Sequence, residues 1–226
     1  MEAQKENLIA LTIEQQQQNK PTIKMITEAG LIGKIGLNSA GVGVCLNAIK
    51  AKGMDPRRIP CHLGLRIALD STSREDAVNT LKFWGVASSC HMLVADATGG
   101  VGLEFSSKDL QKITMNSPWT KQVFHTNHYL AEHVQGVVDT VWLKDSLVRL
   151  VRVEELCDRL GMSPKADEIA EIFKDEKGLP TSICRNERDE SATKTLFNIV
   201  MDLEARKATV TLGRPVEPEE HFELVF

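Results

Sequence analysis

Apolar and polar residues alternate through the first quarter of the chain in the manner of β-strands. Four segments show this pattern: residues 7–15, 22–27, 30–38 and 41–49. The polar tract at residues 15–20 and the following Pro21 predict a hairpin loop between the first two segments. Gly41 stands where the chain turns between the last two. We therefore expect an antiparallel sheet with glycines at its corners.

The Gly and Pro content of residues 51–60 predicts a loop, and the spacing of apolar residues changes after it. Residues 61–71 place their apolar side chains at helical spacing, and Ser73 then stands as the cap of a second helix. We expect both helices to pack on one face of the sheet. Residues 90–105 return to strand chemistry, and the triplet that begins at Thr98 predicts a hairpin turn.

The second half of the chain repeats this alternation of element types. Residues 145–177 predict two helices, the first capped by Ser146 and the second by Ser163, with Pro164 at its first position. Residues 195–226 predict two strands joined by a charged turn and a last short strand. Segregated strands and helices indicate a single α+β domain over residues 1–226, made of packed layers, and argue against a doubly wound βαβ fold.

Composition narrows the classes of partner. The chain has 226 residues, 42% of them hydrophobic, and a net charge of -4 with a pI near 5.9. This charge gives no overall basic field for nucleic acid, although it does not exclude a local basic patch. The sequence lacks a signal peptide and a long apolar run, so we expect no membrane segment. Nucleic acid is therefore not an expected partner.

The five cysteines are odd in number and scattered, without a CxxC pair. This usage fits neither a disulfide framework nor a zinc cage, and it favours a reducing, cytoplasmic location. Cys45 and Cys157 stand in apolar surroundings. Cys184 is next to Arg185, which would lower its pKa and make it the most reactive thiol by local context, although packing is the favoured role.

The segment FHTNH, residues 124–128, is the most unusual in the chain. His125 and His128 flank an asparagine, but no HExxH motif or carboxylate stands at metal-ligand spacing, so we expect no metal. The Gly-rich segments contain neither GxGxxG nor GKS, and no GxSxG motif indicates a serine nucleophile. From the residues alone, a structural role for the histidines is favoured.

Seven motifs in order resemble one family. They are KENLIALTI, PTIKMITEAGLIGKIGLNSAGV, LRIALDSTS, GLEFS, HTNH, SICR and TLFNIVMDLEARKATVTLGRP. Together they resemble the fungal acyl-coenzyme A:6-aminopenicillanic acid acyltransferase family, also called isopenicillin N acyltransferase or peptidase family C45. The resemblance runs from about Lys5 nearly to the end of the chain and is weakest at residues 134–180.

The resemblance implies an N-terminal nucleophile hydrolase with a four-layer αββα sandwich. Members cleave themselves to expose an N-terminal cysteine, whose thiolate attacks an amide or thioester and passes the acyl group to an amine or to water. We therefore expect an acyltransferase or amidohydrolase in fungal secondary metabolism. Its partners would be small-molecule substrates: an acyl-CoA or an amide as donor and a small amine or amino acid derivative as acceptor, with acyl-CoA as a possible co-substrate and no other cofactor. The family also admits a peroxisomal location, but the C-terminal ELVF is not an SKL-type signal.

The resemblance also assigns roles to individual residues. Asn127 matches the asparagine that donates to the oxyanion, with His125 and His128 as its supports. Four further positions match residues at or near the substrate site: Asn38, Ser106, Ser182 and Arg185. Asn38 also fits a turn residue. Arg185 would suit a substrate carboxylate through a bidentate pair.

One departure from the family concerns the nucleophile. In the family, the catalytic cysteine and an NWDF-like segment precede the part that matches KENL, which here begins at Lys5, and none of the five cysteines stands at the matching place. One hypothesis is an acyltransferase whose N-terminal part lies outside this chain. A second is a non-catalytic relative with a binding cleft, and a third is an unrelated metal- or thiol-dependent enzyme using His125, His128 and Cys184.

The missing strands have a structural consequence. Without them, the strand at residues 7–15 would form an unpaired sheet edge, which promotes association. We therefore expect a homodimer or a partner that supplies the missing strands.

Overall fold

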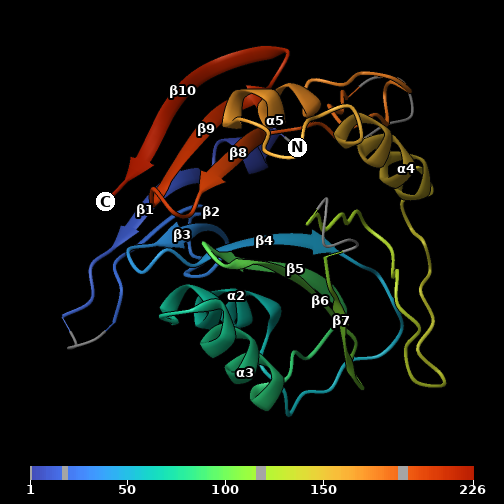
Figure 1. Cartoon of the computed structure of the whole chain (residues 1–226). Helices are drawn as coiled ribbons and strands as arrows, with labels where there is room; N and C mark the ends of the chain where they lie inside the picture. The colour runs from blue at the N-terminus through green and yellow to red at the C-terminus, as the bar shows by residue number, and fades with distance from the viewer. Residues whose placement is uncertain (1, 17–19, 116–120, 188–192) are drawn as a thin grey trace.

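A computed structural model describes residues 2–16, 20–115, 121–187 and 193–226 (Figure 1). In chain order the elements are α1 (Glu2–Lys5), β1 (Leu8–Ile13), β2 (Ile23–Glu28), β3 (Ile35–Asn38), β4 (Gly43–Ala48), α2 (Cys61–Asp70), α3 (Arg74–Trp84), β5 (Cys90–Asp96), β6 (Gly99–Phe105), β7 (Leu110–Ile113), α4 (Asp145–Cys157), α5 (Ala166–Ile172), β8 (Phe197–Asp202), β9 (Lys207–Arg214) and β10 (Glu217–Val225). No helix within these ranges combines the length and apolarity needed to cross a membrane.

The first seven strands form one antiparallel sheet in sequence order, β1 to β7. The predicted hairpins are confirmed: β1 pairs with β2 from Leu8↔Glu28 to Ile13↔Ile23, and β5 pairs with β6. The loop predicted between β1 and β2 includes residues 17–19, which lie outside the described ranges. Strand β1 lies at one edge of the sheet, as expected from residues 7–15. Strand β7, at the other edge, was not predicted.

Helices α2 and α3 cover one face of this sheet (Figure 1). Ser73 caps α3 as predicted, because its side chain accepts a hydrogen bond from the backbone N–H of Asp76. Leu65 of α2 and Leu81 of α3 pack with Met92 and Phe105 in a core from which solvent is excluded. Since strand residues alternate between faces, the neighbouring positions on β5 and β6 point to the opposite side of the sheet, where the polar residues lie.

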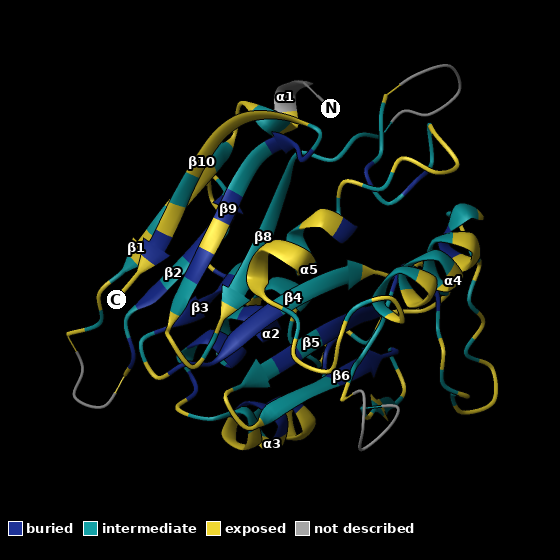
Figure 2. Ribbon diagram, turned by 45° about the horizontal axis from the view of Figure 1, so that its top comes forward, coloured by how far each residue is buried: buried dark blue, intermediate teal, exposed yellow. Residues whose placement is uncertain are grey.

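A second sheet with the order β10-β9-β8 packs on that opposite side. Ile26 and Leu37 of the larger sheet meet Ala208, Val210 and Leu224 of the smaller one in a second core. Helix α5 lies beside β8, and α4 packs against α5 farther from that strand (Figure 2). The order helices, sheet, sheet, helices is the α+β sandwich predicted from the sequence.

Two predicted helix caps are wrong. Helix α4 begins at Asp145 after Lys144, so Ser146 lies inside its first turn, and α5 begins at Ala166 after Lys165 instead of at Ser163. The Ser146 hydroxyl is engaged by the neighbouring loop at residues 126–128 instead of capping its own helix. Tertiary contacts therefore override the local capping preference.

Candidate active site

Asn127 lies in the loop that crosses the polar face of the seven-stranded sheet. Its side-chain Nδ2 donates to the backbone oxygen of Ala48 at 3.0 Å, at the end of β4. An amide nitrogen carries two hydrogens. Within the described residues Ala48 is the only acceptor for Nδ2, so one hydrogen is left for a bound molecule.

The orientation of the Asn127 amide is fixed by Arg149. The Arg149 Nη2 donates to Asn127 Oδ1 at 2.8 Å. A guanidinium can only donate, so the atom facing it must be the oxygen, and Nδ2 must face Ala48. The backbone N–H of Asn127 also donates to the Ser146 hydroxyl at 2.6 Å. Backbone and side chain are thus held from two sides.

Asp145 connects Arg149 to Arg185. Arg149 Nε donates to Asp145 Oδ2 at 2.7 Å, and Arg185 Nη1 donates to the same oxygen. Burial would raise the pKa of Asp145, but the hydrogen bonds from both arginines outweigh it and hold the pKa below its usual value. The two predicted residues Asn127 and Arg185 are therefore joined through two residues that the sequence did not indicate.

His128 supports Asn127 through Ser146. The His128 ring is buried, and its Nδ1 lies 2.7 Å from Ser146 Oγ, the atom that accepts from the Asn127 backbone. Burial lowers the pKa of His128, and the charge of His125 lowers it further. A neutral Nδ1 can accept the Ser146 hydroxyl proton, which leaves the lone pairs of Oγ for the Asn127 N–H.

A buried carboxylate, Glu104, holds the loop on the other side of Asn127. Its Oε1 and Oε2 accept from the backbone N–H groups of Leu130 at 2.6 Å and Ala131 at 2.9 Å, and Oε1 lies 2.9 Å from His125 Nε2. Burial would raise the pKa of Glu104, but the hydrogen bonds from His125, Leu130 and Ala131 together lower it. The fully buried side chain thus stays ionised and pins the loop to β6.

His125 stacks on a second buried histidine, His91 of β5. The ring centroids are 3.6 Å apart and the planes differ by 5°. The two nitrogens of His125 face oxygens of Glu104 and Thr126. Burial, and after it the electrostatic effect of His125, lowers the pKa of His91 to about 2, which keeps the His91 ring neutral.

A cavity of about 620 Å³ opens beside these histidines. Its polar wall includes Asn47, His91 and His125, and most of the remaining wall is apolar, from β8, α4 and α5. The cavity therefore lies between the seven-stranded sheet and the β8 edge of the smaller sheet. An apolar hollow with a few convergent polar groups is the usual form of a ligand site.

The structure corrects the role predicted for Asn38. This side chain is fully buried, and its Nδ2 donates to the carbonyls of Leu69 and Ser71. Its Oδ1 accepts from the N–H groups of Ala40 and Val42. With all four hydrogen-bonding positions filled by backbone, Asn38 closes a turn, the alternative that the sequence also admitted.

Ser106 and Ser182 are likewise engaged locally. The Ser106 hydroxyl bonds to the carboxylate of Asp109 and accepts from two backbone N–H groups of the β6–β7 turn. Ser182 Oγ donates to the carbonyl of Cys184 at 2.6 Å. Both serines are buried, and neither lines the cavity beside His125. The substrate-binding role predicted for them is not what these contacts provide.

Arg185 is also less available than predicted. One guanidinium nitrogen bonds to Asp145 and another donates to Thr193 Oγ1 at 2.9 Å. These contacts occupy two of the five guanidinium N–H groups, on Nε and Nη1. In this structure Arg185 positions Asp145, and through it Arg149.

Cys184 has the packing role that the sequence favoured, but the lowered pKa expected from Arg185 is wrong. The residue is fully buried, and burial raises the pKa of its thiol in spite of the nearby Arg214. Burial also raises the pKa of Cys45, to about 11, and that of Cys157. Among the described residues no hydrogen bond joins a cysteine to Asn127, and no group of His, Cys, Asp and Glu side chains is arranged to hold a metal ion.

Comparison with known proteins assigns the family. The model of the acyl-coenzyme A:6-aminopenicillanic acid acyl-transferase family matches residues 1–217. The chain belongs to this family. It is also 44% identical over 226 residues to the 40 kDa form of acyl-coenzyme A:6-aminopenicillanic-acid-acyltransferase from Emericella nidulans. That alignment covers 99% of this chain but 62% of the relative, so the chain spans less than two thirds of the relative's length.

Solved structures of two acylases share the fold. Penicillin V acylase from Agrobacterium tumefaciens superposes with a TM-score of 0.62 at 13% identity, covering 91% of this chain and 70% of that chain. The N-acylethanolamine-hydrolyzing acid amidase ortholog from Caenorhabditis elegans gives 0.61 at 14% identity, covering 97% and 85%. The family member described here therefore has the acylase-type sandwich of the N-terminal nucleophile hydrolases, as predicted.

Proposed function

We propose that this chain supplies the oxyanion-binding part of an acyl-transfer site, and that the protein moves an acyl group from an acyl-CoA or an amide to a small amine. The observation that carries the proposal is the Asn127 amide. It is oriented by Arg149, tied to Ala48, and keeps one N–H hydrogen for a ligand in the described structure. The name of the 44% identical relative supports 6-aminopenicillanic acid as an acceptor to test.

The nucleophile in this proposal is an N-terminal cysteine on a segment outside this chain. Its thiolate attacks the acyl carbonyl carbon while the carbonyl π electrons move to oxygen, and the oxyanion accepts the free Asn127 hydrogen. Collapse expels the CoA thiolate or the amine, which takes the proton that the cysteine's α-amino group removed from the thiol. The acceptor amine then attacks the thioester through a second oxyanion and gives one proton to the cysteine's α-amino group, which became neutral when it protonated the first leaving group, and the cysteine leaves as the thiolate.

The open edge of β8 is suited to bind the cysteine-bearing segment. Strand β8 pairs only with β9 among the described strands, and its Phe197 and Ile199 line the apolar cavity beside His125. An extended peptide can add to such an edge through backbone hydrogen bonds. From the sequence, we expected the missing strands to add to the β1 edge. The structure shows that β8 borders the cavity and that β1 does not. We propose that the cysteine-bearing strand adds to β8.

The test is acyl transfer by the protein at its natural length, with a panel of acyl-CoA donors and 6-aminopenicillanic acid. Asn127→Ala is expected to lower kcat by about 10²–10³-fold, the usual loss when an oxyanion donor is removed. Asn127 lies two residues beyond His125, outside the residues that line the cavity. Asn198→Ala, at an asparagine of the cavity wall, is the control and should retain kcat within about threefold. Equal activities of the two variants would refute the role of Asn127.

A further inference from the structure

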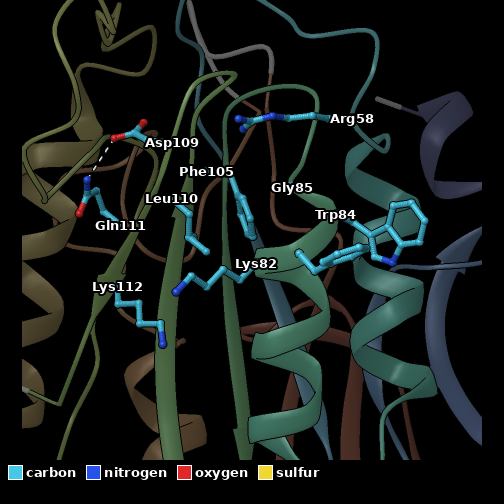
Figure 3. A pocket seen from close by; sticks show the side chains of 10 residues that line it. Arg58, Lys82, Trp84, Gly85, Phe105, Asp109, Leu110, Gln111 and Lys112 are labelled. Atoms are coloured by element: carbon cyan, nitrogen blue, oxygen red, sulfur yellow. Dashed lines mark hydrogen bonds between the residues drawn. The ribbon is translucent and has the colours of Figure 1, made fainter.

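A second hollow lies at the β7 edge of the seven-stranded sheet, on the side covered by α3 (Figure 3). Its volume is about 550 Å³, and its floor includes Phe105 and Leu110. The side chains of Lys82 from α3 and Lys112 from β7 border it, and Arg58 lies at one end (Figure 3). We call this hollow the basic groove.

Two of the three cationic side chains of the basic groove, Lys82 and Lys112, are uncompensated, whereas Arg58 lies 3.7 Å from Asp55 and donates to the carbonyl of Lys108 at 3.0 Å. Lys82 and Lys112 are exposed, and neither has an ion-pair or hydrogen-bond partner among the described residues. The one carboxylate in the lining, Asp109, is already held by His133 at 2.8 Å and by Ser106. A chain with a net charge of -4 thus carries a local basic patch, which favours an anionic ligand.

Two exposed aromatic rings border the same groove. Phe83 is 79% exposed and Trp84 54% exposed, although both rings are large and apolar. Their centroids are 5.3 Å apart in an edge-to-face arrangement. Exposed rings beside unpaired cations suit a ligand with an aromatic base and phosphates, because bases stack on aromatic side chains while lysine and arginine bind phosphate.

The basic groove lies at the same end of the sheet as Asn127. Ala48, whose carbonyl accepts from Asn127, pairs with Cys90, and Cys90 pairs with Phe105 in the groove. The backbone positions of Ala48 and Phe105 are therefore two strand spacings apart, about 10 Å. Because the groove opens on the α3 side and Asn127 lies on the opposite face, a ligand that reaches both must pass around the β7 edge of the sheet. CoA carries its phosphorylated adenosine at the far end of a pantetheine arm, so a CoA thioester needs a nucleotide subsite removed from its reacting carbonyl.

We propose that the basic groove binds the phosphorylated adenosine of the CoA donor, with the base on Trp84 and Phe83 and the phosphates at Lys82, Lys112 and Arg58. The assignment to CoA rests on the proposed function, whereas the chemistry of the groove does not. A free adenine nucleotide offers the same chemistry. The 3′-phosphate distinguishes the two sources, because CoA carries it and ATP does not.

The test is isothermal titration calorimetry of the 226-residue chain with CoA, adenosine 3′,5′-bisphosphate and ATP. CoA and the bisphosphate should bind, and ATP more weakly. The double variant Lys82→Glu/Lys112→Glu is expected to weaken CoA binding by about tenfold or more, and Trp84→Ala by about tenfold, the lower range for loss of one stacked base. These are exposed positions, and Lys112→Glu alone provides the test if the double variant misfolds.

The control is Arg159→Glu/Arg206→Glu, which makes the same change in net charge at exposed sites outside the groove and should leave CoA binding within about twofold. Absence of binding, or equal weakening in both double variants, would overturn the proposal, and tighter binding of ATP than of CoA would overturn its assignment to the acyl donor. Since nucleotide binding needs no nucleophile, groove binding without acyl transfer by the natural-length protein would refute the proposed function alone.

Discussion

At the residue scale, the candidate site depends on charges that are buried and paired. Glu104 accepts hydrogen bonds from two backbone N–H groups and faces His125, while Asp145 accepts hydrogen bonds from two arginines. Such pairs hold geometry well, because removing one partner leaves the other charge buried without compensation. Asn127 lies between the two clusters, so both fix its position.

Glu104→Gln tests the first cluster. The substitution keeps the side-chain shape but removes the charge, and one of its two acceptor oxygens becomes a donor facing a backbone N–H. We expect a loss of about 1–3 kcal/mol in the free energy of unfolding, measured by urea denaturation, and faster hydrogen exchange at Leu130 and Ala131. Glu132→Gln, exposed in the same loop, should change stability by less than about 0.5 kcal/mol. Matching denaturation midpoints would argue against an anchoring role for Glu104.

His91 predicts a pH dependence. Its folded pKa is lowered to about 2 from an ordinary 6.5, so between these values the unfolded chain binds a proton that the folded chain does not. Stability should therefore fall as pH decreases below about 6.5, by up to about 1.4 kcal/mol per pH unit for this group. Glu104 affects stability in a more acidic range. Because its folded pKa is lowered, the stability that it contributes is fully present above its pKa in the unfolded chain and is lost only as the pH falls below that value.

The measurement is unfolding free energy at pH 7 and pH 5. His91→Gln, which does not titrate, should show a smaller loss between these values than the native chain. His221→Gln, an exposed histidine on β10, serves as control and should follow the native chain. A native chain with equal stability at both values would contradict burial of a neutral His91.

The sequence indicated only part of this site. The HTNH motif, residues 125–128, drew attention to Asn127 and its two flanking histidines, and GLEFS contained Glu104 without marking it. Arg149 and Asp145 look like ordinary charges four residues apart on a helix, a spacing common on solvated surfaces. The contact of Arg149 with Asn127, 22 residues away, and that of Asp145 with Arg185, 40 residues away, depend on how α4 packs, which no local pattern encodes.

At the element scale, strand pairing was the most predictable feature and helix starts were the least. The alternation of apolar and polar residues predicted strands β1 to β6. One face of the sheet is buried against α2 and α3, so every second residue of a strand must be apolar. The cap at Ser73 was correct because its hydroxyl has no competing partner. Ser146 has several, and the loop at residues 126–128 engages it instead.

Strand β6 also shows why glycine recurs beside the histidines. A Cβ at Gly102 would lie 2.5 Å from His91 Nε2 and 3.0 Å from Ile113 Cβ, whereas a Cβ at Gly100 would make ordinary contacts of 3.6 Å or more. Gly102→Ala should therefore destabilise the chain by about 1–3 kcal/mol through overpacking, and Gly100→Ala should be nearly neutral. Thermal unfolding of the two variants checks this, and equal melting temperatures would contradict the close packing over Gly102.

At the scale of the whole molecule, the two sheets differ in their number of strands. The larger sheet has seven strands, while the smaller has three among the described residues and ends at β8 beside an apolar cavity. Sequence patterns predicted the layers, because burial on one side leaves a periodic signature. They did not predict the cavity, which arises from the distance between layers and from where β8 ends.

Open edges predict association of the 226-residue chain, either with itself or with an added strand. Ile199→Lys would place a charge on the cavity side of β8 and should reduce association, because charged side chains protect strand edges. Ile9→Lys, on the exposed β1 edge, is the control and should have little effect. Light scattering measures both, and a cooperative, strictly monomeric native chain would contradict the expected role of β8.

The central claim is acyl transfer through a cysteine that meets the Asn127 amide. It is tested most directly by intact mass spectrometry of the natural-length protein after brief exposure to acyl-CoA donors. The proposed function predicts an acyl adduct on an N-terminal cysteine upstream of this chain, and a much smaller yield of that adduct in Asn127→Ala. A natural protein that begins at Met1 and forms no adduct with any donor would contradict the claim and leave a ligand-binding role for the cavity.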